Sequence, residues 1–104
     1  MFDYITTIYI TQYNTMYNTF KGKKVLITGG TGSFGKSFAK HLLKKSKPKK
    51  LVIFSRDEFK QHQLASELQD SRVRFFLGDV RDQQRLNRAF HDIDIVIHAA
   101  ALKQ

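Results

Sequence analysis

Apolar residues follow two different spacings along the chain after residue 20. Four short apolar runs have the length of a buried strand, and the stretches between them repeat apolar residues three or four positions apart. The runs predict strands, and the wider spacing predicts amphipathic helices. The expected strands are 24–28, 51–54, 73–77 and 93–98, and the expected helices are 33–45, 58–69 and 83–90. Because strands and helices alternate with short connections, the expected fold class is α/β, with a doubly wound parallel sheet and right-handed crossovers.

The first twenty residues do not share this pattern. They are rich in Thr, Tyr, Asn and Ile and carry one charge, at Asp3. Residues 4–10 have the β-branched composition of a strand, but no hairpin signal pairs them with a neighbour. We therefore expect residues 1–20 to be a poorly ordered N-terminal extension, with Met16 as an alternative start, and residues 21–104 to form the folded domain.

Composition narrows the class of protein. A length of 104 residues suits one small domain, and 41% hydrophobic and 26% charged residues are ordinary for a globular chain. The absence of cysteine excludes disulfides, thiolate metal sites and a cysteine nucleophile, and the scattered histidines lack metal-ligand spacing. No apolar run reaches the length of a membrane span, and the N-terminus lacks a secretory signal. The default expectation is a cytoplasmic protein with no metal and no membrane partner.

The net charge of +9 is concentrated in one part of the chain. Ten lysines and no acidic residue lie between Lys21 and Lys50, whereas eight basic and eight acidic residues lie from Leu51 onward. Such an excess can bind phosphate-rich partners, but it is also typical of a solvated helix end, where cations suit the helix dipole. The excess is centred on residues 44–50, where no aromatic residues interleave the lysines, so the solvated helix end is favoured and no nucleic-acid partner is expected.

The segment ITGGTGSFG, residues 27–35, places glycines between the first expected strand and the first expected helix. Glycine destabilises element interiors, so this density serves backbone geometry. Two dinucleotide spacings are satisfied, Gly30-x-Gly32-x-x-Gly35 and Gly29-x-x-Gly32-x-x-Gly35. In this setting one glycine forms the turn, one lets backbone N–H groups reach phosphate, and one lets helix and strand pack closely. The segment predicts a dinucleotide site on a Rossmann sheet, of which the four strands and three helices would be the N-terminal half.

The end of the second expected strand bears on the choice of cofactor. An NAD site usually has an acidic residue there that accepts from the ribose 2′-hydroxyl. This chain has Ser55 and Arg56, followed by Asp57, and Lys60 lies one helical turn further on. A hydroxyl and a guanidinium suit a 2′-phosphate, so NADP is favoured over NAD. Arg56 as a solvated loop residue and Asp57 as the cap of the next helix remain compatible with this assignment.

Two later segments add candidate ligand contacts. GDVRD, residues 78–82, closes the third expected strand, and we expect Asp79 to meet the adenine edge while Asp82 caps the next helix. IHAAALK, residues 97–103, ends the fourth strand with three small residues that let ribose and nicotinamide approach the backbone. His98 is more typical of a buried core histidine than of a catalyst.

Several of these segments together resemble a known family. TGGTGSFGK, FSRDEFKQ, RFFLGDVRD, RLNRAF and IHAAALK resemble the N-terminal region of UDP-N-acetylglucosamine 4,6-dehydratases. They are most similar to the C5-inverting enzymes that begin pseudaminic acid synthesis, which are extended short-chain dehydrogenase/reductases and use NADP. The resemblance covers nearly all of residues 23–104.

The resemblance implies a set of cofactor contacts. Residues 31–34 would contact the pyrophosphate region and residues 55–60 the adenosine phosphate. Asp79 and Val80 would contact the adenine, and Ala99 the ribose side. The expected cofactor-binding residues are Gly29, Thr31, Gly32, Ser33, Phe34, Gly35, Ser55, Arg56, Asp57, Glu58, Phe59, Lys60, Asp79, Val80 and Ala99.

The resemblance also implies a reaction. In that family, bound NADP+ takes a hydride from sugar C4, water leaves across C5 and C6, and the hydride returns to C6. Lys103 matches a family lysine that reaches the UDP-sugar. The family's acid and base residues, including a Tyr-x-x-x-Lys pair, follow the fourth strand, so no catalytic residue is expected within residues 1–104.

The chain is thus expected to be an N-terminal, NADP-binding fragment of a lyase that acts on UDP-N-acetylglucosamine for surface or flagellar glycan synthesis, with a homo-oligomeric parent. Alone it is expected to be marginally stable and inactive, because an apolar sheet face and the edge of the fourth strand would meet water. The alternatives are a fragment of an epimerase relative, an NADP-binding module that completes its sheet against a partner and, least favoured, a basic nucleic-acid-binding protein.

Overall fold

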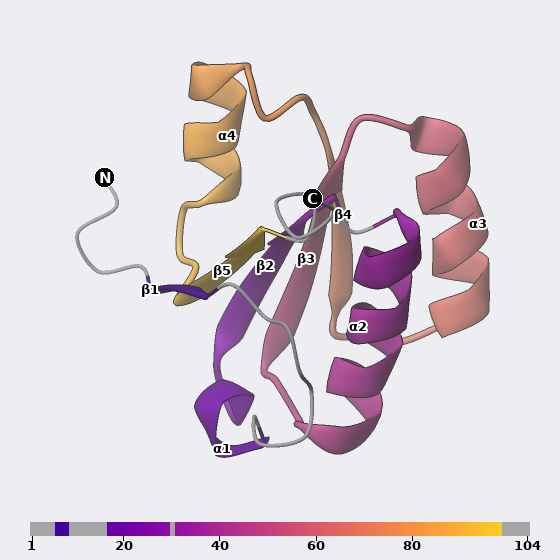
Figure 1. The fold of residues 1–104 in the computed structure, drawn as a ribbon, viewed down its shortest axis with the longest axis vertical. Helices are drawn as coiled ribbons and strands as arrows, with labels where there is room; N and C mark the ends of the chain where they lie inside the picture. Colours follow the sequence, from indigo (N-terminus) through magenta and orange to yellow (C-terminus); the bar gives the residue numbers. More distant parts are fainter. Residues whose placement is uncertain (1–5, 9–16, 30, 99–104) are drawn as a thin grey trace.

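The computed structural model describes residues 6–8, 17–29 and 31–98, which form a parallel sheet flanked by helices (Figure 1). The strand order across the sheet is β1-β5-β2-β3-β4. The strands are β1 Thr6–Ile8, β2 Lys24–Thr28, β3 Lys50–Ser55, β4 Val73–Leu77 and β5 Ile95–His98, and the helices are α1 Tyr17–Phe20, α2 Ser33–Lys45, α3 Glu58–Leu68 and α4 Gln83–Ala89. Every predicted strand and helix is present, and every strand pair is parallel. The predicted α/β class, with half of a doubly wound sheet, is confirmed.

Successive strand residues point to opposite faces of the sheet, and both faces are covered. α2 and α3 pack on one face and α4 packs on the other, as right-handed crossovers predict (Figure 1). The first layer buries Val25, Ile27, Phe38, Ala39, Leu42, Leu51, Ile53, Leu64, Ile95 and Ile97, together with Phe20. The second layer buries Leu26, Val52, Phe54, Ala89, Phe90, Ile93 and Val96.

The second face corrects one prediction. The apolar strand residues on this face were expected to meet water, yet Leu26, Val52, Phe54 and Val96 are at most 6% exposed, and Phe76 of β4 is partly buried against them. The reason is that the cover extends past the end of α4. Phe90 and Ile93 follow the helix in the next turn and pack into the same layer.

The N-terminal segment corrects a second prediction. β1 pairs in parallel with β5, in the register Thr6↔Ile95, Thr7↔Val96 and Ile8↔Ile97, so this edge of β5 is not open. The missing hairpin signal was uninformative because a hairpin joins antiparallel strands, whereas a parallel partner needs no tight turn.

α1 is the other part of the N-terminal segment that the structure describes. Phe20, its last residue, is fully buried and packs edge-to-face on Phe38 of α2 with 5.9 Å between ring centroids. The structure thus assigns a strand to Thr6–Ile8 and a helical turn to Tyr17–Phe20 within the segment for which we expected an extension. The remaining part of residues 1–20, including Met16, lies outside the described residues.

Candidate functional site

A cleft of about 650 Å³ lies at the carboxyl edge of the sheet, where β2, β3 and β4 end. Parallel strands bring their carboxyl ends to one edge, so loops far apart in the sequence meet there. The cleft is lined by Gly29, Thr31, Gly32, Ser33, Phe34, Gly35, Phe54, Ser55, Arg56, Asp57, Lys60, Gly78, Asp79, Val80 and Arg81. Most of the predicted cofactor residues are thus brought together by the fold.

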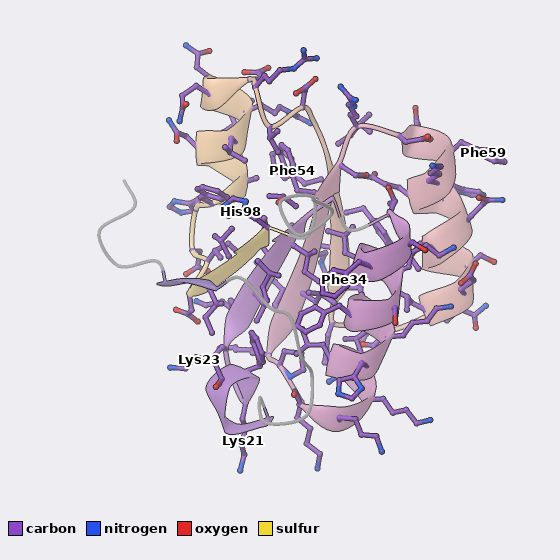
Figure 2. The ribbon with its side chains drawn as sticks, in the orientation of Figure 1. Lys21, Lys23, Phe34, Phe54, Phe59 and His98 are labelled. Atoms are coloured by element: carbon purple, nitrogen blue, oxygen red, sulfur yellow. The ribbon has the colours of Figure 1, made fainter. Side chains whose placement is uncertain are left out.

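Four predicted residues are not part of this lining. Glu58 and Phe59 begin α3 and border a separate groove on that helix. The Phe59 side chain is 69% exposed and points outward from α3 (Figure 2). Ala99 and Lys103 lie outside the described residues.

The glycine segment forms a turn that leads from β2 into α2. Gly29 has φ +70°, in the left-handed region that favours glycine, and its N–H donates to the Phe54 carbonyl of β3 at 3.0 Å. Gly32 N–H then donates back to the Gly29 carbonyl at 3.1 Å. Gly35 is buried on the sheet side of α2, so the absence of a side chain lets helix and sheet approach closely. The turn holds the start of α2 at the mouth of the cleft.

The start of α2 offers backbone donors to a ligand. Its N-cap residue is Gly32, which makes no side-chain capping bond, and the first turn contains no acidic residue. The first N–H groups of a helix have no partner within the helix, and the helix dipole places partial positive charge at this end. An anion such as a pyrophosphate is therefore the ligand class that suits this point of the cleft.

Ser55 lies buried at the end of β3 and lines the same cleft. Its hydroxyl oxygen accepts a hydrogen bond from Gln61 Nε2 at 2.9 Å, which leaves the hydroxyl proton for another acceptor. Gln61 also donates to the carbonyl groups of Ser55 and Phe76, both at 3.2 Å, and so ties α3 to the ends of β3 and β4. Sequence reasoning did not identify Gln61, because a glutamine on a helix gives no signal of burial.

Two arginines and one carboxylate form a charged group on the cleft wall. Arg56 and Arg81 both lie within ion-pair distance of Asp79, at 3.3 and 2.8 Å. Hydrogen bonding from Arg81, with a smaller contribution from Arg56, holds the pKa of the Asp79 carboxyl far below its usual range. Asp79 is therefore ionised and paired at neutral pH. Arg81 was not among the predicted site residues, although it stands in the GDVRD motif.

Gly78 and Phe54 are two further lining residues that the sequence analysis did not single out. A side chain at Gly78 would place its Cβ 2.9 Å from the Phe54 ring and 2.8 Å from Arg85 Cγ. Phe54 stands at the carboxyl edge of the sheet (Figure 2) and stacks with Phe76 at 5.8 Å between centroids. Glycine is needed at position 78 because the loop after β4 lies directly against this ring.

His98, at the end of β5, is not among the residues that line the cleft. Its Nδ1 lies 3.1 Å from the Thr28 hydroxyl oxygen, and partial burial lowers the pKa of its imidazole. It is therefore neutral at pH 7. Among the residues that the structure describes, no group of histidine and acidic side chains is placed to hold a metal ion. None of the helices in the described part of the chain is long and apolar enough to cross a membrane.

Comparisons with known proteins agree with this geometry. A family model described as polysaccharide biosynthesis protein matches residues 25–104. The chain is 56% identical to the UDP-N-acetylglucosamine 4,6-dehydratase (inverting) of Campylobacter jejuni over 81% of this chain and 25% of that protein. It is 47% identical to the UDP-glucose 4-epimerase of Rickettsia prowazekii over 82% of this chain and 26% of that protein.

A solved structure is similar in fold as well as sequence. The X-ray structure of Pen from Bacillus thuringiensis superimposes with a TM-score of 0.74 and 44% identity, over 82% of this chain and 26% of that one. The chain thus spans about a quarter of the length of the curated relatives it matches. The family match over residues 25–104 includes all the residues that line the cleft.

Proposed function

The chain belongs to the polysaccharide biosynthesis protein family, and from that premise we propose that it is the NADP-binding part of a UDP-N-acetylglucosamine 4,6-dehydratase. The family resemblance inferred from the motifs is confirmed by the 56% identity to the Campylobacter jejuni enzyme. The observation that carries the cofactor proposal is the cleft itself, which is lined both by the start of α2, without an acidic cap, and by Arg56, Lys60 and Arg81. The full protein would be a lyase in glycan sugar synthesis of the pseudaminic acid type, in the cytoplasm.

The residues of the cleft fit a dinucleotide phosphate in both size and chemistry. A volume of about 650 Å³ falls within the usual range for cofactor sites, and the start of α2 provides N–H donors for a pyrophosphate. The exposed Val80 side chain and the backbone at Gly78 provide a surface for the adenine. When bound, NADP would supply the hydride acceptor and donor for chemistry at the sugar. The described residues of this chain would bind and orient it.

The charges in the cleft support NADP over NAD. Arg56 and Lys60 line the wall next to Ser55, where an adenosine 2′-phosphate would lie. Asp57 accepts from the Lys60 backbone N–H at 3.0 Å as a helix cap, and Asp79 is paired with arginines. The charge of each carboxylate is thus partly compensated within the chain, whereas a 2′-phosphate would gain the cations Arg56 and Lys60.

The remaining site assignments belong to the same proposal. We propose that Ala99 faces the ribose of the cofactor and that Lys103 reaches the UDP-sugar. No catalytic residue is assigned within this chain, and by itself it would not turn over the sugar. The full-length protein would form a homo-oligomer.

The similarity to UDP-glucose 4-epimerases supports a second candidate. An epimerase and a dehydratase would use the same dinucleotide cleft, and they differ in what happens to the sugar after oxidation. Incubation of the full-length protein with UDP-N-acetylglucosamine separates them. A product that has lost water supports the dehydratase, and a product of unchanged mass with an inverted hydroxyl supports the epimerase.

The cofactor proposal is tested by following the thermal unfolding of the purified chain with increasing NADP+ or NAD+. We expect NADP+ to raise Tm at concentrations where NAD+ has little effect, because a ligand that binds only the folded state stabilises it. Equal stabilisation by both cofactors would contradict the assignment of Arg56 and Lys60 to a 2′-phosphate. No response to either would contradict the proposed function of this cleft in the chain.

A further inference from the structure

Two arginines from different loops share one carboxylate on the cleft wall. The Arg56 and Arg81 guanidinium groups approach Asp79 Oδ2 to 3.3 and 2.8 Å. Arg56 follows β3 and Arg81 follows β4, and all three side chains line the cleft. Because a single negative charge faces two positive charges, the group has positive charge to offer to an anion.

The carboxylate is not shared equally. Arg81 donates through Nε to Oδ1 at 3.1 Å and to Oδ2 at 3.3 Å, and through Nη2 to Oδ2 at 2.8 Å. Its backbone N–H adds a bond to Oδ1 at 2.9 Å. Arg56 makes one contact with Asp79, from Nη1 at 3.3 Å. Since bidentate guanidinium–carboxylate pairs are the stronger ones, Arg81 is the main partner of Asp79 and Arg56 is the more easily released.

An unneutralised Asp79 would harm a phosphate site in two ways. Its charge would repel a dianionic 2′-phosphate nearby, and it would compete with that phosphate for Arg56. A cofactor that carries only a 2′-hydroxyl would suffer neither effect, because it is neutral at that position and a hydroxyl can donate to a carboxylate. The charge state around Asp79 therefore discriminates between the two cofactors.

We infer that Arg81 is a positioning residue for cofactor specificity: by occupying Asp79 it leaves Arg56 to bind the 2′-phosphate. This inference rests on the proposed NADP function of the cleft. Arg81 acts through Asp79 and needs no contact with the cofactor. Neither the glycine segment nor the Ser55–Lys60 segment, on which the choice of NADP was based, includes it.

The test is calorimetric titration of the chain and of Arg81→Gln with NADP+ and with NAD+. We expect the Kd for NADP+ to rise about tenfold in the variant while the Kd for NAD+ changes less than about twofold. In the double variant Asp79→Asn with Arg81→Gln, the ratio of the two Kd values should return to within about threefold of the original, since the charge to be neutralised is gone. Arg81→Lys keeps the positive charge but loses the forked guanidinium, so its Kd for NADP+ should lie between those of the unmodified chain and Arg81→Gln.

Arg74→Gln is the matched control. Arg74 is an exposed arginine of β4 whose Nη1 donates to the Ser71 and Val73 carbonyls, and it lies away from the cleft lining. The control removes the same net charge, so an unchanged Kd ratio in it excludes a general effect of net charge. Circular dichroism of each variant reports whether it is folded.

The outcomes separate this inference from the proposal on which it rests. If the unmodified chain binds neither cofactor, the proposed function is overturned and this inference with it. If the chain prefers NADP+ and Arg81→Gln keeps the same preference, only this inference is overturned. Equal weakening toward both cofactors, without recovery in the double variant, would also overturn it, because Arg81 would then serve the fold or the shared part of the dinucleotide.

Discussion

The start of α2 differs from the starts of α3 and α4, although all three helices begin at the same edge of the sheet. Asp57 caps α3 and Asp82 caps α4, and each carboxylate accepts from a backbone N–H three residues later, at 3.0 and 3.2 Å. α2 begins after Gly32, which has no side chain to serve as an acceptor. A carboxylate cap satisfies helix donors from within the chain, whereas a glycine cap leaves them for an outside anion.

The N-terminus of a helix thus has two uses in this chain: the starts of α3 and α4 stabilise the fold, and the start of α2 is left for a ligand. The capped helices gain stability whether or not a ligand is bound. α2 would gain a comparable contribution only with an anion at its N-terminus, so in this region stability and binding would be linked. The capping carboxylates accordingly stand at the starts of α3 and α4, while Arg56 and Lys60 line the cleft together with the start of α2.

The largest expected effect comes from giving α2 the cap that the other helices have. In Gly32→Asp the backbone already has the extended conformation of an N-cap, and a Cβ would lie an ordinary 3.5 Å from the Gly29 carbonyl. The new carboxylate should raise the free energy of unfolding by about 0.3 kcal/mol and weaken NADP+ binding at least about 100-fold, since it occupies the donors and repels phosphate. Calorimetry and thermal unfolding measure the two effects.

Gly32→Asn serves as its matched control. Asparagine also caps a helix but carries no charge, so its effect on NADP+ affinity should be clearly smaller than that of aspartate. If aspartate stabilised the chain and left NADP+ affinity unchanged, the start of α2 would not be the phosphate site.

A smaller effect is expected from removing the cap of α4, one of the two helices that begin with a capping carboxylate. Asp82→Ala should lower the free energy of unfolding by about 1 kcal/mol, which corresponds to a drop in Tm of about 4–8 °C for a domain of this size. NADP+ affinity should stay within about twofold, because Asp82 does not line the cleft. Gln84→Ala, an exposed change on the same helix, controls for helix propensity. A large loss of NADP+ affinity in Asp82→Ala would mean that the capped helices also serve the ligand.

The smallest expected effect is a pH dependence at the end of β5, beside the start of the glycine segment. Burial lowers the pKa of His98, so the unfolded chain binds the proton more readily than the folded one. The contribution of His98 to stability is therefore complete above its ordinary pKa of about 6.5 and is lost as the pH falls below that value. His98→Gln should make the free energy of unfolding fall less between pH 7.5 and 5.5, as measured by urea unfolding. An unchanged slope would contradict burial of a neutral imidazole.

The sequence was informative wherever the signal is local. Apolar spacing located the helices and strands, and the predicted ranges 33–45 and 73–77 coincide with α2 and β4. The caps Asp57 and Asp82 were predicted from the residues alone and are confirmed, because capping depends on neighbours within one turn. The glycine spacing indicated a turn into a helix, and Gly29 adopts the positive φ that such a turn requires.

The features that were missed depend on contacts between distant segments. β1 was not predicted as a strand because no hairpin signal gave it a neighbouring partner. Its partner is β5, which lies almost ninety residues further along the chain. Gln61 carries no local mark, and its bond to the Phe76 carbonyl forms only when β3 and β4 end side by side. Arg81 is the exception, because its partner Asp79 lies only two residues earlier in the chain.

By itself, the sequence determined the α/β class, the order of the elements and the place of the glycine turn, because periodicity, capping and backbone conformation are set over a few residues. Only the tertiary structure decided which edge of the sheet β1 covers, how the second face is closed and that Arg56 reaches Asp79. Those outcomes depend on packing and charge between segments that come together only after the chain has folded, and no short stretch of sequence contains both partners.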